Sequence, residues 1–583
     1  MKTKNKVMTT KRGNENFGNG NVLNFVLAGL FAVVLVFLAR GNVFAYSNLG
    51  GGVCECDSCS DCTNALNDNA NCSCTAKLNK SITDIQGTCI DDPENFTNKT
   101  FDCQGNVIKG YPYYFANYAI HTRDKQNNTI KNCVITQFYG GIYLYSFSNN
   151  TLTNNTTNNN VSYGIYGIYL YSFSNNTITS NTTNNNGGNY GGISLEHSSN
   201  NALVNNTANS NNWMGINLES DSSNNTLTNN TANSNIFGIY LEQSINNILR
   251  NNTFANNRFN FNIYESEISH YYQDIDKSNI VNNKPIYYLK DCAKSEINES
   301  SDDEFVALIS CDNITLKNLN LTRNSHGILL VHTTNSRILN NTVNSNYEGR
   351  IYLYLCVNNT MSNNIANLNI FGISLDSSSN NNTLTNNTAN SNMGSGRIML
   401  RHSSNNTLTN NTADNNRHDG IHFLWGSNFN EILNNKISNN KNGITLSNCD
   451  HPGIGCFERN TNNTIQGNEI LNNTVGIFSN ASNSTINSNY VCGNTQLDFD
   501  LGDWLSSVGD NNYCGNAGGW NDANTIGCQN TGKATSIFDL VEMLEYLNRE
   551  KNLSYLSYCD LDNDNNVNLP DAFALIDKIV REG

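Results

Sequence analysis

The sequence predicts an all-β protein, built as one long parallel β-solenoid, with a small α-helical domain at its C-terminal end. A pattern of polar and apolar residues repeats every 22 to 26 residues, which is the period of one solenoid coil. Beyond the N-terminal apolar segment, helical periodicity appears only after residue 530. The length of 583 residues also favours a repeat array over one globular core.

The composition excludes several classes of protein. The net charge is −15 and Lys and Arg are not clustered, so nucleic acid is not an expected partner. Five prolines exclude a proline-rich stalk, and 42 glycines without a triplet period exclude collagen. The bias towards Asn, Thr and Ser is compatible with disorder, but 24 Phe, 27 Tyr and regularly spaced Ile and Leu favour a repeat fold with polar turns.

Residues 1–45 have the order of a secretory signal peptide. A polar stretch with several Lys and Arg precedes the apolar run Val22 to Ala39 and the triplet Val43-Phe44-Ala45, which suits cleavage after Ala45. An uncleaved anchor is the alternative, because the apolar run approaches the length that spans a bilayer. We therefore expect an extracellular, cell-surface protein that meets the membrane only through this segment, if the segment is not cleaved.

Residues 46–110 form a Cys-rich N-terminal cap, and the chain holds 18 cysteines in all. In an exported protein such cysteines indicate disulfides, although the close spacing also permits a zinc or cluster site. The dense group is Cys54, Cys56, Cys59, Cys62, Cys72, Cys74, Cys89 and Cys103. Later short-range candidates are Cys292 with Cys311, Cys449 with Cys456, Cys492 with Cys514, and Cys528 with Cys559.

The repeat runs from about Asn128 to Asn489. Its clearest copies are GIYLYSFSNNTLTNNTTNNN from Gly141 and GIYLYSFSNNTITSNTTNNN from Gly167. Within a copy, alternating residues such as Ile142 and Leu144 can point inward while their neighbours point outward. The paired asparagines suit corners, because Asn tolerates left-handed backbone geometry and can form hydrogen-bonded ladders between coils. Leucine-rich repeats share the period but need a different leucine pattern and a helix.

This pattern resembles the right-handed parallel β-helix repeats of the NosD-type and "carbohydrate-binding and sugar hydrolysis" families. The resemblance implies a first run of coils at 111–264, a NosD-type interruption at 265–312 around IDKSNIVNNKPIYYLKD, and a second run at 313–490. This scaffold carries lyases, hydrolases, epimerases, adhesins and inert spacers alike, so it does not fix a function. NosD itself is linked to copper-enzyme maturation, but the nine histidines here are scattered and form no Met/His cluster.

One outward face changes from coil to coil and concentrates carboxylates and tyrosines. Glu196, Glu219 and Glu242 are predicted to stack on successive coils about 4.8 Å apart. Such stacking calls for a cation, a raised pKa or full solvent exposure, because like charges repel. Neighbouring carboxylates suit a retaining glycosidase, and carboxylates two coils apart suit an inverting one. The catalytic candidates are Glu196, Glu219, Glu242 and Asp376.

Tyrosines on the same face are candidates for glycan binding, because aromatic rings stack on the apolar faces of pyranoses. The alternative is that they are ordinary β-surface residues. Signature sets of polygalacturonases and pectate lyases are absent, and His418 and His422 on either side of Gly420 are weak candidates for a metal or catalytic site. The glycan-binding candidates are Tyr143, Tyr145, Tyr169, Tyr171, Tyr240, Tyr352 and Tyr354.

Asn-x-Ser/Thr sequons number roughly thirty, as in a heavily glycosylated surface protein. Because Asn-Asn-Thr is also the chemistry of the repeat's turns, we expect most sequons to be structural and a minority, at exposed corners, to be modified.

After a cap or linker at 491–527, residues 528–583 contain a duplication. SIFDLVEMLEYLNRE from Ser536 matches NLPDAFALIDKIVRE from Asn568, which predicts two amphipathic helices, each preceded by a loop. The second loop, from Asp560 to Asp571, spaces its oxygen ligands as a calcium loop requires. The predicted calcium ligands are Asp560, Asp562, Asp564, Asn566, Asn568 and Asp571.

The loop resembles that of dockerins, an EF-hand-like family, with Asn565 in place of the usual glycine. The first loop, from Cys528, lacks carboxylates at positions 1 and 5, so one Ca²⁺ is expected. The resemblance implies a cohesin-like partner; a self-contained calcium-stabilised cap is the alternative. We therefore predict an exported surface β-helix that binds glycans or forms surface structure, docked to its partner through calcium. A polysaccharide lyase or glycoside hydrolase acting on acidic polysaccharide, and a purely structural envelope protein, are the alternatives, with catalysis the less favoured.

Overall fold

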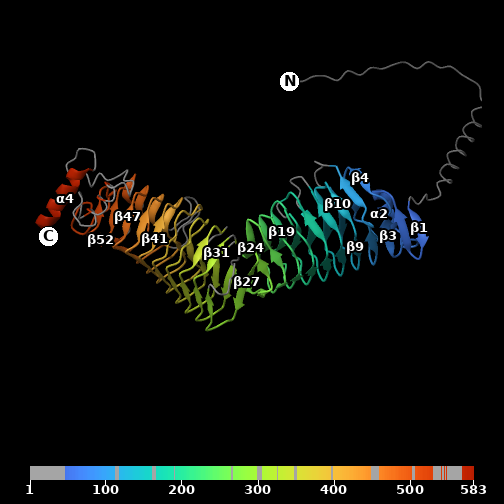
Figure 1. Cartoon of the computed structure of the whole chain (residues 1–583), viewed down its shortest axis with the longest axis horizontal. Coiled ribbons are helices and arrows are strands. Elements are labelled where there is room, and N and C mark those ends of the chain that lie inside the picture. The colour runs from blue at the N-terminus through green and yellow to red at the C-terminus, as the bar shows by residue number, and fades with distance from the viewer. Residues whose placement is uncertain are drawn as a thin grey trace, which may run out of the picture.

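Figure 1 shows the protein as a computed structural model in which two rods of stacked coils meet at an angle. No helix in the described part of the chain is long and apolar enough to cross a membrane. The described residues are 46–111, 117–160, 166–188, 191–263, 267–298, 305–322, 324, 326–346, 351–394, 398–447, 459–501, 506–528, 540, 544, 547 and 568–582.

The first rod has three parallel sheets, which confirms the predicted parallel β-solenoid. Sheet A is the longest and begins with an antiparallel strand; it contains β1 (Ser47–Gly50), β2 (Val53–Cys56), β3 (Thr75–Leu78), β6 (Thr100–Asp102), β9 (Thr129–Lys131), β12 (Thr151–Thr153), β15 (Thr177–Thr179), β18 (Ala202–Val204), β20 (Thr226–Thr228), β22 (Ile248–Arg250) and β25 (Asp274–Ile275). Sheet B contains β4 (Ile82–Ile85), β7 (Val107–Gly110), β10 (Val134–Thr136), β13 (Thr156–Asn158) and β16 (Thr182–Asn184).

Sheet C contains β5 (Ile90–Asp91), β8 (Tyr118–Arg123), β11 (Gly140–Tyr145), β14 (Tyr166–Tyr171), β17 (Ile193–Glu196), β19 (Met214–Glu219), β21 (Phe237–Leu241) and β24 (Phe259–Ile263). Its register places Ile142 beside Ile168, and Ile168 beside Ile193, so equal positions of successive coils form one buried apolar column. Such a column removes apolar surface from water along the whole rod.

The second rod repeats this plan. Sheet D starts at the end of the first rod with β23 (Thr253–Phe254) and β26 (Ile280–Val281). It continues along the second rod with β27 (Lys284–Lys290), β29 (Phe305–Ile309), β32 (Ile328–Val331), β35 (Ile351–Tyr354), β37 (Ile373–Asp376), β39 (Ile398–Arg401), β42 (Asp419–Leu424), β45 (Asn442–Ser447), β48 (Val475–Ser479) and β51 (Leu497–Leu501). Sheet E contains β28 (Glu296–Asn298), β30 (Thr315–Lys317), β33 (Arg337–Leu339), β36 (Thr360–Ser362), β38 (Thr383–Thr385), β40 (Thr407–Thr409), β43 (Glu431–Leu433), β46 (Thr464–Gln466), β49 (Thr485–Asn487) and β52 (Val508–Asp510). Sheet F has two parts, β31 (Asn320–Thr322) with β34 (Thr342–Asn344), and β41 (Thr412–Asp414), β44 (Lys436–Ser438), β47 (Glu469–Leu471), β50 (Tyr490–Cys492) and β53 (Tyr513–Cys514).

Two adjacent asparagines have different roles at the Asn-Asn corners of the coil. Asn149 has a positive φ of 54° and is exposed, whereas the next residue, Asn150, is buried. The Asn150 side chain donates to the Asn176 side chain of the following coil at 3.1 Å, which continues the ladder. The expected left-handed corner and the expected ladder are therefore both present, on adjacent residues.

The segment between the rods closes the first and starts the second. It contains the short helix η1 (Ile268–Tyr271), then β25 and β26, which pair with the last coil of the first rod, and then an antiparallel turn into β27. The turn residues Asn282 and Asn283 both have positive φ, as a tight hairpin needs.

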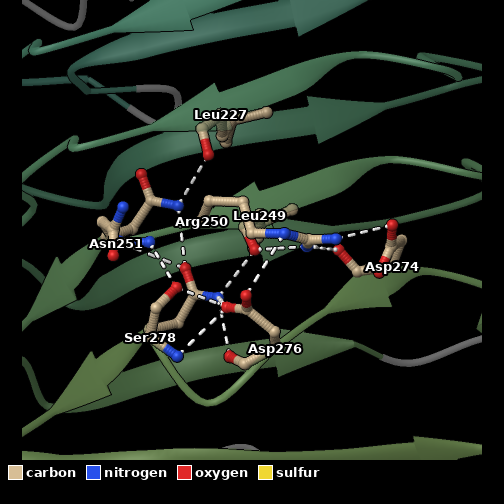
Figure 2. Close-up of polar contacts among 9 residues, drawn as sticks. Leu227, Leu249, Arg250, Asn251, Asp274, Asp276 and Ser278 are labelled. Atoms are coloured by element: carbon tan, nitrogen blue, oxygen red, sulfur yellow. Dashed lines mark hydrogen bonds and ion pairs between the residues drawn. The ribbon is translucent and has the colours of Figure 1, made fainter.

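Arg250 fastens this last coil (Figure 2). Its guanidinium donates to the Asp274 carbonyl at 2.7 Å and to the Asp274 carboxylate at 2.7 Å, and it lies 3.3 Å from the Asp276 carboxylate. Ser278 accepts a hydrogen bond from the Asn251 backbone N–H at 2.8 Å. These bonds satisfy polar groups at the end of the array that no further coil covers.

The start of sheet D is buried on both faces, and this determines the bend. Along β29, Val306 and Leu308 belong to the core of the second rod, whereas Phe305 belongs to the core of the first. The Phe305 ring lies 4.8 Å from the Phe261 ring of β24. The outer face of the second rod therefore packs against the end of the first rod.

Disulfides clamp the N-terminal cap around the helix α2 (Cys59–Asn67). Most thiols of the dense cysteine group, whose spacing also permits a zinc site, form disulfides with one another. Cys103 forms a disulfide with Cys133, which lies outside the cap. The described bonds are Cys54–Cys72, Cys56–Cys62, Cys59–Cys89, Cys103–Cys133, Cys292–Cys311 and Cys514–Cys528. They indicate an oxidising, extracytoplasmic compartment.

The predicted pair Cys292–Cys311 is present, and Cys449 and Cys456 lie outside the described residues. The pairs Cys492–Cys514 and Cys528–Cys559 are wrong, because Cys514 is bonded to Cys528. The register explains the error, since Val491 is the residue opposite Cys514 and Cys492 points to the other side of its strand.

The described C-terminal end is one helix, α4 (Leu569–Glu582). Most of the predicted calcium loop, from Asp560 to Val567, lies outside the described residues, as does the predicted signal peptide at 1–45. The two-helix calcium domain therefore stays a prediction.

Candidate functional site

Sheet C presents two columns of stacked tyrosines on its outer face. The rings of Tyr143 and Tyr169 lie 5.2 Å apart and nearly parallel, and those of Tyr145 and Tyr171 lie 5.0 Å apart. The first column is half-buried to buried, whereas Tyr145 is 38% exposed. Because each ring covers one face of its neighbour, a ligand can contact mainly the edges of the stacked rings. The exposed ring of Tyr145 is also accessible to a ligand.

Carboxylates continue the same face along the rod. Glu196 stands in register with Tyr171 on one side and with Glu219 on the other. The Tyr169 hydroxyl donates a hydrogen bond to the Glu196 carboxylate, and the His197 ring lies 4.0 Å from it. The predicted stack of acids is therefore present at Glu196 and Glu219.

Glu219 has the most unusual environment of these acids. Burial, followed by the charge of Glu196, raises its pKa to about 7, and Glu242 adds a smaller effect. Its Oε1 atom is buried and accepts no hydrogen bond from any described residue. Glu219 can therefore exist protonated or ionised near neutral pH, as a proton donor or acceptor requires.

Glu242 and Tyr240 lie one coil further along. Glu242 follows β21 and is half-buried, and the Tyr240 ring meets Phe237 edge to face at 5.4 Å. Phe237 in turn packs with Met214 and Phe259 in a small apolar cluster on this face. Tyr240 is thus part of a packed surface at the far end of the band.

The near end of the band holds a polar group that sequence reasoning missed. His121 lies with Nδ1 2.8 Å from the Asp91 carboxylate, and the Arg123 side chain donates to its Nε2 at 3.3 Å. The Tyr118 ring stacks on Tyr143 at 5.0 Å, so this group adjoins the tyrosine columns. The sequence contains a signal for this group. In YAIHTR, before Asp124, inward and outward side chains alternate as they do in the later coils, which places His121 on the outer face.

The candidates on sheet D are placed differently. Tyr352 is 1% exposed and Tyr354 is 8% exposed, because both lie in the packed junction between the rods. Both rings are enclosed by protein, so their position gives no support to the glycan-binding role, which stays a prediction.

Asp376 is also enclosed. Its carboxylate forms an ion pair with Arg401 and accepts a hydrogen bond from the Tyr352 hydroxyl at 3.1 Å, and its side chain is fully buried. Arg401 in turn lies over the Trp425 ring at 5.7 Å. An acid held by a guanidinium and closed to solvent is a structural ion pair in this geometry, so the catalytic role of Asp376 stays a prediction without support from its position.

His422, one of the two histidines near Gly420, lies in a buried polar group of sheet D. His422 pairs through Nδ1 with Asp419 at 2.7 Å, and both side chains are buried on the outer face of sheet D. Asn442 donates to the same aspartate at 2.9 Å. The His418 backbone carbonyl accepts a hydrogen bond from the Lys441 backbone N–H at 2.7 Å.

The parallel coils, the disulfides and the band on sheet C define the class: an extracytoplasmic β-helix protein. The family model described as "Periplasmic copper-binding protein (NosD)" matches residues 67–287 and 308–516, most of the chain. The chain belongs to this family. No curated relative matches the sequence.

Several solved structures are similar in architecture. The A-module of Azotobacter vinelandii mannuronan C-5 epimerase AlgE6 shows 14% identity over 80% of this chain and 97% of that chain, with a TM-score of 0.26. The AlgE4 A-module from the same organism shows 13% identity over 79% and 98%, with a TM-score of 0.25. A PL6 alginate lyase in complex with a trisaccharide shows 12% identity over 75% and 80%, with a TM-score of 0.21. At such low identity and TM-score, these matches say nothing about the activity of this chain.

Proposed function

We propose that this protein is an extracytoplasmic, surface-displayed β-helix that binds glycans along the outer face of sheet C. The observation that carries the proposal is the continuous band from Tyr145 and Tyr171 to Glu196 and Glu219. Phenol hydroxyls and carboxylates repeat along it about every 4.8 Å, and such groups exchange hydrogen bonds with sugar hydroxyls. A linear glycan lying along the rod meets several coils at once, and its weak contacts add up.

The test is binding of the full chain to a panel of neutral and uronic-acid polysaccharides, measured by affinity electrophoresis. Tyr145→Ala and Tyr171→Ala are each expected to remove about 1.4 kcal/mol of binding free energy, which corresponds to about tenfold weaker binding. Tyr490→Ala is the matched control, because Tyr490 stacks on Tyr513 at 4.7 Å on sheet F. Binding that all variants retain equally would place the glycan site away from these tyrosines of sheet C and overturn the proposal. No binding by the unmodified chain would leave a purely structural envelope protein as the better description.

A second candidate function is cleavage of an acidic polysaccharide, and the raised pKa of Glu219 favours it. Glu219 would deliver or remove a proton, and Glu196 on the adjacent coil has the spacing of a retaining pair, about 5 Å. A product assay that scores reducing ends and unsaturated sugars tests this. Glu219→Gln is expected to abolish products while Glu431→Gln, on sheet E, keeps them. Products that survive Glu219→Gln would exclude this site, and no products would leave binding alone.

The C-terminal module remains a proposed docking element. Asp571 is buried, and its carboxylate accepts a hydrogen bond from the Asn568 backbone N–H at 2.9 Å, so two predicted calcium ligands are adjacent at the start of α4. We expect Ca²⁺ to bind there and to order a surface for a cohesin-like partner. Isothermal titration of the full chain with Ca²⁺ should give a one-site heat that Asp560→Ala and Asp562→Ala remove. If the variants titrate as the parent does, the loop is not the calcium site.

None of these proposals involves a copper-binding site. The family description names copper, but no three His, Cys, Asp or Glu side chains among the described residues come together as a metal site.

A further inference from the structure

We infer that the first asparagine of the Asn-Asn-Thr corners is the acceptor of N-linked glycans, in two rows along the rods. The second asparagine of each corner is excluded from modification. The inference uses only the corner geometry and does not depend on glycan binding at sheet C.

The corner geometry separates the two asparagines completely. In Asn149-Asn150-Thr151, the first residue of the sequon is exposed with φ 54° and the second is fully in the ladder. Corners stack directly, since the Asn149 backbone N–H donates to Ser174 and the Asn175 backbone N–H donates to Ser199 in the following coils. The same exposed position therefore recurs on coil after coil.

The overlapping sequons at Asn154-Asn155-Thr156-Thr157 show the difference within one corner. Both asparagines satisfy the Asn-x-Thr rule. Asn154 is exposed. Asn155 is fully buried, and its amide donates to the Ile130 carbonyl at 2.9 Å and to Asn181 at 3.0 Å. Sequence alone treats these two sites as equal, and the structure does not.

The chemistry excludes the buried asparagine. In the transfer, the C1–O bond of a lipid-phosphate-linked sugar breaks and the phosphate leaves with the electron pair. The side-chain nitrogen bonds to C1 and loses one proton. Asn155 uses two N–H donors in the ladder, so a modified Asn155 would lose one bond and would have to place a sugar inside the coil. The first asparagine makes no such demand on the core.

The acceptor rows lie on the two corners that flank sheets A and B, and sheets E and F. The first row precedes strands of sheets A and E: Asn127, Asn149, Asn175, Asn224, Asn358, Asn381, Asn405 and Asn462. The second row precedes strands of sheets B and F or the equivalent bridges: Asn154, Asn205, Asn229, Asn251, Asn340, Asn386 and Asn410. Figure 2 shows Asn251 at the last corner of the first rod.

The third corner, which precedes sheets C and D, is nearly free of such acceptors in the described coils. Its doublet Asn256-Asn257 is followed by Arg258, and Asn415-Asn416 by Arg417; Asn472, before Thr474, is the exception. Glycans would therefore coat the uniform Thr and Asn side of the rods. The face that carries Tyr145, Glu196 and Glu219 would stay uncoated.

Crowding limits how many acceptors are filled. Successive coils are about 4.8 Å apart, and an N-glycan is bulky, so neighbouring sites in one row compete for space. We expect partial occupancy, with vacant sites next to filled ones.

The experiment is glycopeptide mapping by mass spectrometry on the full chain purified from the cells that naturally make it. Sugar is expected on Asn154 and on other members of the two rows, and none on Asn155 or on Asn181, a buried asparagine that is itself a sequon with Thr183. Sugar on Asn155 or Asn181, or no sugar at any of the listed asparagines, would overturn the inference.

The substitution Thr156→Ala gives a matched test. It removes the sequon of Asn154 but keeps that of Asn155, which needs Thr157. The variant is expected to lose the Asn154 glycopeptide and gain none at Asn155, with the occupancy of Asn224 unchanged. Because Thr156 is only half-buried, the variant should fold, and circular dichroism of the purified protein checks this. Transfer of the sugar to Asn155 would contradict the inference.

Discussion

At the scale of single residues, position in the coil matters more than residue type. Asn154 and Asn155 have the same side chain, but one tolerates a left-handed corner in solvent and the other completes a buried hydrogen-bond ladder. Glu196 and Glu219 are likewise equal in sequence. Glu196 accepts a hydrogen bond from Tyr169, whereas burial and the neighbouring Glu196 charge raise the pKa of Glu219 to about 7. The environment of each asparagine determines whether a sugar can be attached to it. The environment of each glutamate determines at which pH it binds a proton.

The raised pKa of Glu219 predicts a pH dependence of stability. Its folded pKa is about 7, above the usual 4.5, so the folded state binds the proton more tightly than the unfolded state. The contribution to stability is therefore full below about pH 4.5 and is lost as the pH rises through 7. After allowance for solvent screening we expect the loss to be about 1–2 kcal/mol.

Urea unfolding of the parent and of Glu219→Gln at pH 5 and pH 8 measures this effect. The parent should lose more stability than the variant between the two pH values. Glu431→Gln, on sheet E, is the control and should follow the parent. An equal pH dependence in the parent and in Glu219→Gln would show that Glu219 does not titrate in this range.

At the scale of elements, one outer face serves two different purposes. On sheet C it carries the tyrosine columns and the acids, while the start of sheet D turns the same face into a packed contact with the first rod. The corner ladders, by contrast, are the same in both rods. The variable face is therefore where each coil acquires its own role, and the corners hold the coils in register.

The ladder predicts a large difference between two neighbouring substitutions. Asn155→Ala removes bonds to the Ile130 carbonyl, to Asn181 and from the Cys133 N–H, and leaves buried polar groups without partners. We expect a loss of about 2–3 kcal/mol. Asn154→Gly keeps the left-handed corner and should change stability by less than about 1 kcal/mol. Chemical unfolding distinguishes them, and equal losses would mean that the ladder does not stabilise the coil.

At the scale of the whole molecule, the bend between the rods depends on apolar packing rather than on a flexible linker. Phe305 and Phe261 meet at the junction, and Tyr352 and Tyr354 are buried beside them. A packed interface of this kind fixes the angle at which the two rods project, as Figure 1 shows.

We expect Phe305→Ala to cost about 3–5 kcal/mol and to loosen the angle between the rods. Small-angle X-ray scattering should then show a broader distribution of maximum dimension. Phe173→Ala is the control, since Phe173 is equally buried and stacks on Phe147 at 5.6 Å inside the first rod. That variant should lose stability but keep the angle. A scattering profile unchanged in Phe305→Ala would show that other contacts set the bend.

The repeat pattern alone predicts the parallel coils, the inward Ile and Leu columns, the left-handed asparagine corners, the neighbouring acids Glu196 and Glu219 and the disulfide Cys292–Cys311. These are local properties, because a repeat of fixed period places equal residues on top of one another. The burial of Tyr352, Tyr354 and Asp376, the group around His121 and the bond between Cys514 and Cys528 become visible only in the folded chain. Those features depend on how the rods meet and on which side of a strand a residue points, and contacts between residues far apart in the chain are not encoded in the period of a repeat.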